Sequence, residues 1–237
     1  QFLPRKDILT LEEIERLFDN FMEIGVEKSR LTGGEPLVRN DIIKLIKKLN
    51  TKKEQTNLKE ITLTTNVTLL KKYAKKLKLN GINRINVSLD TINPEKYNKI
   101  TRFGNIKKVF DGINEALDAH IKIKINTVVI KDFNENEIKE LINWTSNKKI
   151  DLTFIEVMPM GELNGQNRLD QYWSMNDLRE ALESKWTLED IPVNTGGPAR
   201  SAEINATMGR LGFLPPSLNA FCHRCDRFCL HRSFTLI

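Results

Sequence analysis

The chain contains 237 residues, of which 40% are hydrophobic and 29% are charged, and 37 basic against 31 acidic side chains give a formal net charge of +6. This composition is typical of a folded globular protein with one large or two small domains, and it excludes fibrous and low-complexity classes. Aromatic residues make up 7% of the chain, too few for a nucleic-acid platform that interleaves aromatic and basic side chains. Because neither a signal-peptide pattern nor an apolar run of about 18 residues is present, we expect a cytoplasmic protein without a membrane span.

The first predicted elements are a helix, a strand and a second helix. Residues 1–5 resemble the interior of a loop and lack an initiator Met. Thr10 and Glu13 form a capping-box pattern that opens a helix, and helical spacing places its apolar residues on one face: Leu11, Ile14, Leu17, Phe18 and Phe21. A buried strand is expected at 26–31. A helix at 41–49 follows, with these residues directed inward: Ile42, Ile43, Leu45 and Ile46.

The same alternation continues along the chain. Further strands are predicted at 60–66, 84–90, 121–130 and 152–158, and helices between them at 69–79, 106–119 and 136–146. Alternating strands and helices with short connections require parallel strands and right-handed crossovers. Five strands are fewer than the roughly eight of a closed barrel, so an open doubly wound sheet and a partial barrel both remain open. Beyond 158 we expect a loop, a helix within 173–186, a turn at 196–200 and a strand at 209–214.

Two glycines directly follow the predicted strand at 26–31. Gly33 and Gly34 allow a sharp turn that a ligand can approach without meeting a Cβ atom. Exposed N–H and C=O groups at such a turn can bind a small zwitterion or anion, and Glu35 adds a carboxylate. The alternative interpretation is a plain strand-to-helix turn.

Polar residues gather near the carboxyl end of each predicted strand, at 33–35, 64–66, 88–90 and 156–158. Ligands bind at that edge in parallel α/β folds, although each polar residue can instead cap the following helix. Lys124 alternates with Ile123 and Ile125 inside its strand. In a barrel lumen it would bind a phosphate, whereas on an edge strand it would face water.

All three cysteines lie at or beyond residue 222, and a clustered odd set favours metal binding over disulfides. Cys222 and Cys225 can reach one metal, and Arg224 and Arg227 would favour their thiolate forms. A metal site needs further ligands, for which the neighbouring candidates are Cys229, His223 and His231. The alternative is a set of free thiols.

An ordered set of motifs, at 32–36, 64–66, 86–90, 154–158, 196–200 and 221–227, resembles the GTP 3′,8-cyclase family of radical S-adenosylmethionine enzymes over nearly the whole chain. The resemblance implies an α/β partial (βα) barrel, with a core at 1–160 and a Cys-containing extension at 161–237. It also implies a reaction of molybdenum cofactor biosynthesis. In that reaction a first 4Fe-4S cluster cleaves S-adenosylmethionine, the resulting radical abstracts hydrogen from C3′ of GTP, and the ribose carbon attacks C8.

The resemblance further implies the binding residues. Those for S-adenosylmethionine are Gly33, Gly34, Glu35, Ser88 and Met158, and those for GTP are Arg30, Thr64, Lys124 and Arg227. Cys222 and Cys225 would bind a second 4Fe-4S cluster that leaves one iron for the guanine base. The implied partners are GTP, S-adenosylmethionine, a reductant protein and a second copy of the chain.

The sequence departs from the family pattern in three places. The Cys-x3-Cys-x2-Cys ligands of the first cluster and the preceding first strand are not in the chain, and a third ligand of the second cluster would fall at position 239. Cys229 stands where the family has a second arginine. We therefore expect either a fragment or decayed copy of a cyclase, inactive as given, or an enzyme whose ends lie outside this sequence. Two further hypotheses are a different radical S-adenosylmethionine enzyme, such as a peptide-modifying one, and a non-catalytic remnant that holds zinc.

Overall fold

The computed structural model describes residues 8–158, 162–163, 166–167, 170–192, 199–204 and 209–215. The described strands form an eight-stranded sheet in the order β1-β2-β3-β4-β5-β10-β9-β8, together with a separate β6–β7 ribbon. The order begins at β1 and ends at β8 without closing on itself, as in a partial barrel. Contacts divide the chain into two compact units, whose described parts are 8–86 with 107–123, and 87–106 with the residues from 124 onward. The proposed boundary near residue 160 stays a prediction.

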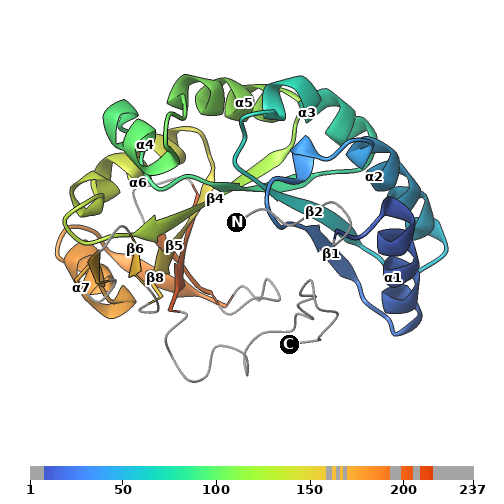
Figure 1. Cartoon of the computed structure of the whole chain (residues 1–237). Coiled ribbons are helices and arrows are strands. Elements are labelled where there is room, and N and C mark those ends of the chain that lie inside the picture. Colours follow the sequence, from blue (N-terminus) through green and yellow to red (C-terminus); the bar gives the residue numbers. More distant parts are fainter. Residues whose placement is uncertain are drawn as a thin grey trace. The chain divides into compact units, whose positions relative to one another are not determined.

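The first unit consists of a parallel strand pair covered by helices (Figure 1). β1 pairs with β2 from Lys28↔Glu60 to Leu31↔Leu63. Ile61 and Leu63 of β2 are fully buried. The bounds of the elements in this unit are α1 Leu11–Glu23, β1 Lys28–Leu31, η2 Pro36–Val38, α2 Ile42–Thr51, η3 Lys52–Glu54, β2 Glu60–Thr65, α3 Leu70–Leu79 and α5 Ile106–Asp118. Ile106, the first residue of α5, is counted with the second unit. Strand β3, Arg84–Ser88, is divided between the two units after Asn86.

Helix α1 begins where the capping box predicted. Glu13 N–H donates to Thr10 Oγ1 at 3.1 Å, and Thr10 N–H donates to Glu13 Oε2 at 2.7 Å. Phe18 is buried, whereas the other apolar residues predicted for this face are only half-buried. The ion pair between Lys48 and Glu15, at 2.8 Å, joins α1 to α2.

Replacing Thr10 by Ala is expected to lower the free energy of unfolding by about 1 kcal/mol, because it removes the hydroxyl that accepts from Glu13 N–H and leaves only the bond from the main-chain N–H of residue 10 to Glu13. Urea denaturation followed by circular dichroism measures the change. Glu12→Ala, in the same helical turn but outside the box, is the control. An equal loss in both variants would mean that the cap contributes nothing of its own.

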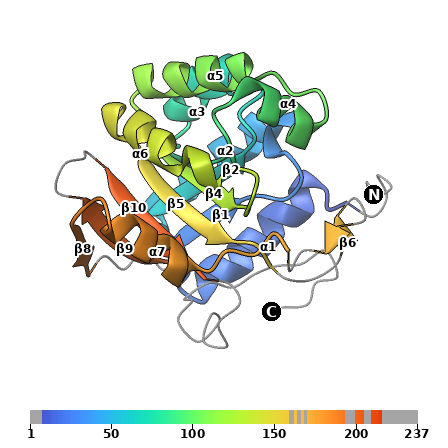
Figure 2. The same ribbon diagram turned by 90° about the vertical axis from the view of Figure 1, so that its left-hand side faces the viewer.

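The second unit contains parallel strands followed by antiparallel ones (Figure 2). β4 runs parallel to β5, from Lys124↔Asp151 to Val129↔Glu156, and β10 runs parallel to β5 on its other side. β9 and β8 follow as antiparallel strands. The bounds of its elements are α4 Pro94–Thr101, β4 Lys122–Val129 (whose first two residues belong to the first unit), η4 Glu135–Glu137, α6 Ile138–Asn147, β5 Asp151–Glu156, β6 Glu162–Leu163, β7 Gln166–Asn167, α7 Met175–Glu183, β8 Leu188–Ile191, β9 Arg200–Ile204 and β10 Arg210–Leu214.

Several elements differ from the sequence-based expectation. Helix α4 was not predicted, although Asn93 caps it by accepting from two backbone N–H groups and Pro94 occupies its first turn. Strands β8 and β9 were also missed, and Arg200, expected to end a turn, is the first residue of β9. The predicted strands at 84–90 and 152–158 both end two residues earlier, at Ser88 and Glu156, and beyond Ser88 the side chain of Asp90 accepts from Val128 N–H.

Candidate functional site

The turn after β1 has the backbone conformation that its glycines predicted. Gly33 has φ +95° and Gly34 has φ +55°, both in the left-handed region that favours glycine. Among the described residues, a Cβ atom at either position would meet nothing within 4 Å. Within this part of the chain the requirement for glycine comes from the backbone conformation and not from crowding, and the described residues leave the face of this turn open.

The carboxylate of Glu35 joins this turn to the end of β2. Its Oε1 accepts from Thr65 Oγ1 at 2.8 Å and from Leu37 N–H at 3.1 Å, and its Oε2 accepts from Asn66 N–H at 2.7 Å. Thr65 Oγ1 in turn accepts from Val67 N–H at 3.0 Å. Because both carboxylate oxygens are engaged by the chain itself, Glu35 fixes the conformation of the glycine turn.

Arg30 and Thr64 occupy the same face of the β1–β2 pair. Arg30 stands opposite Thr62 in the parallel register, and Thr64 lies two residues further along β2, so the alternation of side chains places all three on one face. Arg30 and Thr64 are each half-buried. The first unit thus brings a cation and a hydroxyl to the face of β1 and β2 that lies opposite Leu63.

In the second unit, the end of β3 is held by hydrogen bonds to the end of β4. Ser88 is the last residue of β3 and is exposed. Beyond it, Leu89 N–H donates to Asn126 O at 3.1 Å, and Asp90 Oδ1 accepts from Val128 N–H at 2.8 Å. Burial raises the pKa of the Asp90 carboxyl, against the opposing effect of that N–H group. Burial, with a smaller contribution from the nearby Asp90 carboxylate, raises the pKa of Tyr97.

Because its pKa is raised, the Asp90 carboxyl contributes stability that is lost as the pH rises through the raised pKa. The native state keeps this proton at pH values where the unfolded chain, with a carboxyl pKa of about 4, has already lost it. Asp90→Asn keeps an acceptor for Val128 N–H and removes the titration. We therefore expect the difference in unfolding free energy, variant minus wild type, to increase from pH 4 to pH 7, as measured by urea denaturation. Asp111→Asn, whose carboxylate forms an exposed pair with Lys71, is the control. A difference for Asp90→Asn that stays constant with pH would contradict the assignment.

Strands β4 and β5 carry the remaining predicted residues of this unit. Along β4, Ile123 and Ile125 are buried, whereas Lys124 is half-buried on the opposite face, as the alternation predicted. At the end of β5, Glu156 is 4% exposed and its Oε1 accepts from Met175 N–H at 2.8 Å and from Tyr172 Oη–H at 3.2 Å. Met158, two residues beyond β5, is 45% exposed.

Comparisons with known proteins identify the family. The model of the radical SAM superfamily matches residues 1–145, and that described as Molybdenum Cofactor Synthesis C matches residues 150–233. A GTP 3′,8-cyclase of Rhizobium meliloti is 50% identical over 99% of the chain and 67% of its own length, and one of Brucella ovis is 52% identical over 95% and 65%. The chain belongs to the GTP 3′,8-cyclase family of radical SAM enzymes.

The chain spans about two thirds of the length of these curated relatives. Among solved structures, Streptococcus suis SuiB bound to S-adenosylmethionine matches 90% of the chain and 45% of its own, with a TM-score of 0.61 and 19% identity. This likeness supports the radical SAM fold that the family membership implies and confirms the predicted partial barrel.

Each unit of this family member, taken alone, contains part of the predicted binding set. The first contains Gly33, Gly34, Glu35, Arg30 and Thr64 on β1, β2 and their connection, and the second contains Ser88, Lys124 and Met158 on or just beyond β3, β4 and β5. Their contacts with ligands stay predictions. Arg227, Cys222 and Cys225 lie outside the described residues, as do positions 196–198 of the glycine-proline turn.

Two kinds of feature are absent from the described ranges. Within them, no cluster of three or more His, Cys, Asp or Glu side chains is placed to hold a metal ion. No helix in the part of the chain that the structure describes combines the length and apolarity needed to cross a bilayer.

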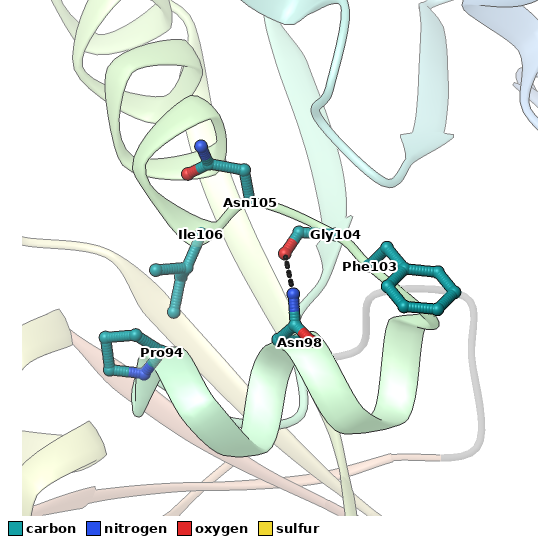
Figure 3. A pocket seen from close by; sticks show the side chains of 6 residues that line it. All are labelled: Pro94, Asn98, Phe103, Gly104, Asn105 and Ile106. Carbon is teal, nitrogen blue, oxygen red and sulfur yellow. Dashed lines mark hydrogen bonds between the residues drawn. The ribbon is translucent and has the colours of Figure 1, made fainter.

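A pocket of about 320 Å³ lies between α4 and the start of α5 (Figure 3). Asn98 Nδ2 donates to Gly104 O across it at 3.4 Å, and Phe103 at its rim is 90% exposed. The residues that line it are Pro94, Asn98, Phe103, Gly104, Asn105 and Ile106. Because none of them is titratable, this pocket supplies no acid, base or nucleophile.

Proposed function

We propose that this chain forms the core of a GTP 3′,8-cyclase, which converts GTP to (8S)-3′,8-cyclo-7,8-dihydroguanosine 5′-triphosphate in molybdenum cofactor biosynthesis. The observation that carries the proposal is the identity of about half of all residues with enzymes of that name, over almost the entire chain. The match to the Molybdenum Cofactor Synthesis C model adds support, because it covers residues beyond the part matched by the superfamily model.

The proposed site for S-adenosylmethionine begins at the glycine turn. The open face of Gly33 and Gly34 fits a ligand that binds main-chain groups, such as the amino acid end of this cofactor. Glu35 would maintain the turn, and Ser88 and Met158, both exposed, would contact the nucleoside end. Bound S-adenosylmethionine would supply a radical that abstracts hydrogen.

The proposed site for GTP uses cations to balance the triphosphate. Arg30 and Lys124 are half-buried residues of β1 and β4, where partial removal from water strengthens their attraction to phosphate oxygens. Thr64 would accept or donate a hydrogen bond, and Arg227 would add a third cation. The carboxylates of Glu35 and Glu156 accept hydrogen bonds from the chain itself, which reduces their repulsion of the triphosphate.

The remaining parts of the proposal rest on the family alone. Cys222 and Cys225 would be ligands of a 4Fe-4S cluster, a reductant protein would supply electrons, and the enzyme would act in the cytoplasm as a homodimer. Cys222 and Cys225 lie outside the described residues.

The test is conversion of GTP by the complete natural polypeptide that carries this sequence, purified anaerobically with iron and sulfide and supplied with S-adenosylmethionine and dithionite. The expected result is an isomer of GTP that chromatography separates from the substrate, together with equimolar 5′-deoxyadenosine. Formation of 5′-deoxyadenosine without this isomer would favour another radical SAM activity.

A further inference from the structure

Asn134 is a buried side chain that links two strand ends and to which neither the sequence motifs nor the proposed function gives a role. It is 1% exposed. Its Nδ2 donates to Asp90 O at 2.7 Å and to Val128 O at 2.8 Å, and its Oδ1 accepts from Ile130 N–H at 2.8 Å. One amide therefore holds main-chain groups that follow β3 and main-chain groups at the end of β4.

These bonds continue the pairing of β3 and β4 beyond the regular ladder. β3 ends at Ser88, yet Leu89 N–H donates to Asn126 O, and Thr127 Oγ1 donates to Leu89 O at 2.8 Å. Asn134 then binds the carbonyl of the next residue, Asp90. Because the residues directly after Ser88 are fixed in this way, the position of the exposed Ser88 side chain depends on them.

The chemistry of the contact requires an amide. Two carbonyl oxygens need two donors, and one N–H group needs an acceptor, a combination that the planar side chain of Asn supplies and that Asp or Leu does not. A buried carbonyl or N–H group left without its partner costs more than the bond itself contributes, so removal of the amide favours rearrangement of the strand end.

We propose that Asn134 is a positioning residue, which sets the end of β3 so that Ser88 meets S-adenosylmethionine. The inference rests on the proposed function for the identity of the ligand, but the link between the strand ends is measurable without it. In this proposal Asn134 makes no contact with the ligand and acts through the main chain of Leu89 and Asp90.

The test compares three variants of the complete natural polypeptide. Asn134→Ala removes all three bonds. Thr127→Val removes only the bond to Leu89 O and keeps the shape and strand preference of a fully buried residue, so it tests the same link with a smaller structural change. Thr145→Ala is the matched control, because Thr145 is also buried in this unit but donates only within α6, to Leu141 O and Ile142 O.

Two readouts separate this inference from the proposed function. Amide hydrogen exchange at Leu89, Val128 and Ile130 is expected to accelerate about tenfold in Asn134→Ala and less in Thr127→Val, relative to Thr145→Ala. The KM for S-adenosylmethionine is expected to rise about tenfold in Asn134→Ala and about threefold in Thr127→Val, with the KM for GTP unchanged. Exchange and KM values equal to those of Thr145→Ala would overturn the inference. If the wild type does not convert GTP, the proposed function fails and exchange alone decides whether Asn134 fixes the strand ends.

Discussion

Replacing Glu35 by Ala is expected to weaken the binding of S-adenosylmethionine by about 30- to 100-fold, equivalent to 2–3 kcal/mol. The carboxylate accepts hydrogen bonds from Leu37 N–H, Thr65 Oγ1 and Asn66 N–H, and without it the turn at Gly33 and Gly34 loses its attachment to β2. Since the cofactor would bind the main chain of this turn, the loss acts through the conformation of the turn. Equilibrium dialysis with the complete natural polypeptide measures the affinity.

Two matched variants show which part of the Glu35 contact matters. Glu35→Gln keeps one carbonyl acceptor but replaces the other oxygen by an amide NH2 group, which donates and cannot accept from a neighbouring donor, so its effect should be intermediate. Thr65→Val removes a single bond from the same carboxylate and is expected to have the smallest effect. Affinity in Glu35→Ala equal to that of the wild type would show that the turn holds its shape without the carboxylate.

Replacing Lys124 by Met is expected to raise the KM for GTP by about 10- to 100-fold, the range for loss of a charge-assisted bond to phosphate. Lys124 is half-buried on β4, where an ammonium group is only partly hydrated. Steady-state kinetics at fixed S-adenosylmethionine measure the effect. Thermal unfolding of the variant distinguishes lost binding from lost stability.

Lys122→Met is the control for this prediction. Lys122 lies on the same strand and the same face, two residues earlier, but is exposed. Its replacement removes an equal charge and should leave the KM for GTP within about twofold, since an exposed charge is screened by solvent and salt. An equal rise in both variants would mean that only the overall positive charge of the chain attracts GTP, and that Lys124 makes no specific contact.

The sequence predicted the repeating part of the fold because local signals determine it. The capping box at Thr10, the alternation around Lys124 and the paired glycines each act within a few residues, and the structure has all three. Helix α4 was missed because its apolar pattern is weak. Tyr97 is the one residue of this helix that is buried, so the sequence shows no repeated apolar spacing there. β8 and β9 were missed for a similar reason, since their outward residues are charged and few apolar positions mark the alternation.

The support of the candidate site was not predictable from local patterns. Glu35 meets Thr65 across 30 residues of sequence, and Asn134 meets Asp90 across 44. No periodicity in either segment indicates the partner, because the contact exists only once the strands have paired. The roles of Ser88, Met158 and Arg227 followed from resemblance and stay predictions.

Transfer of deuterium from C3′ of GTP shows whether this family member acts on the ribose of its proposed substrate. The complete natural polypeptide is incubated with GTP deuterated at C3′, S-adenosylmethionine and a reductant, and 5′-deoxyadenosine is analysed by mass spectrometry. We predict one deuterium in 5′-deoxyadenosine and its loss from the nucleotide product. Unlabelled 5′-deoxyadenosine formed at the same rate with or without GTP would contradict the account.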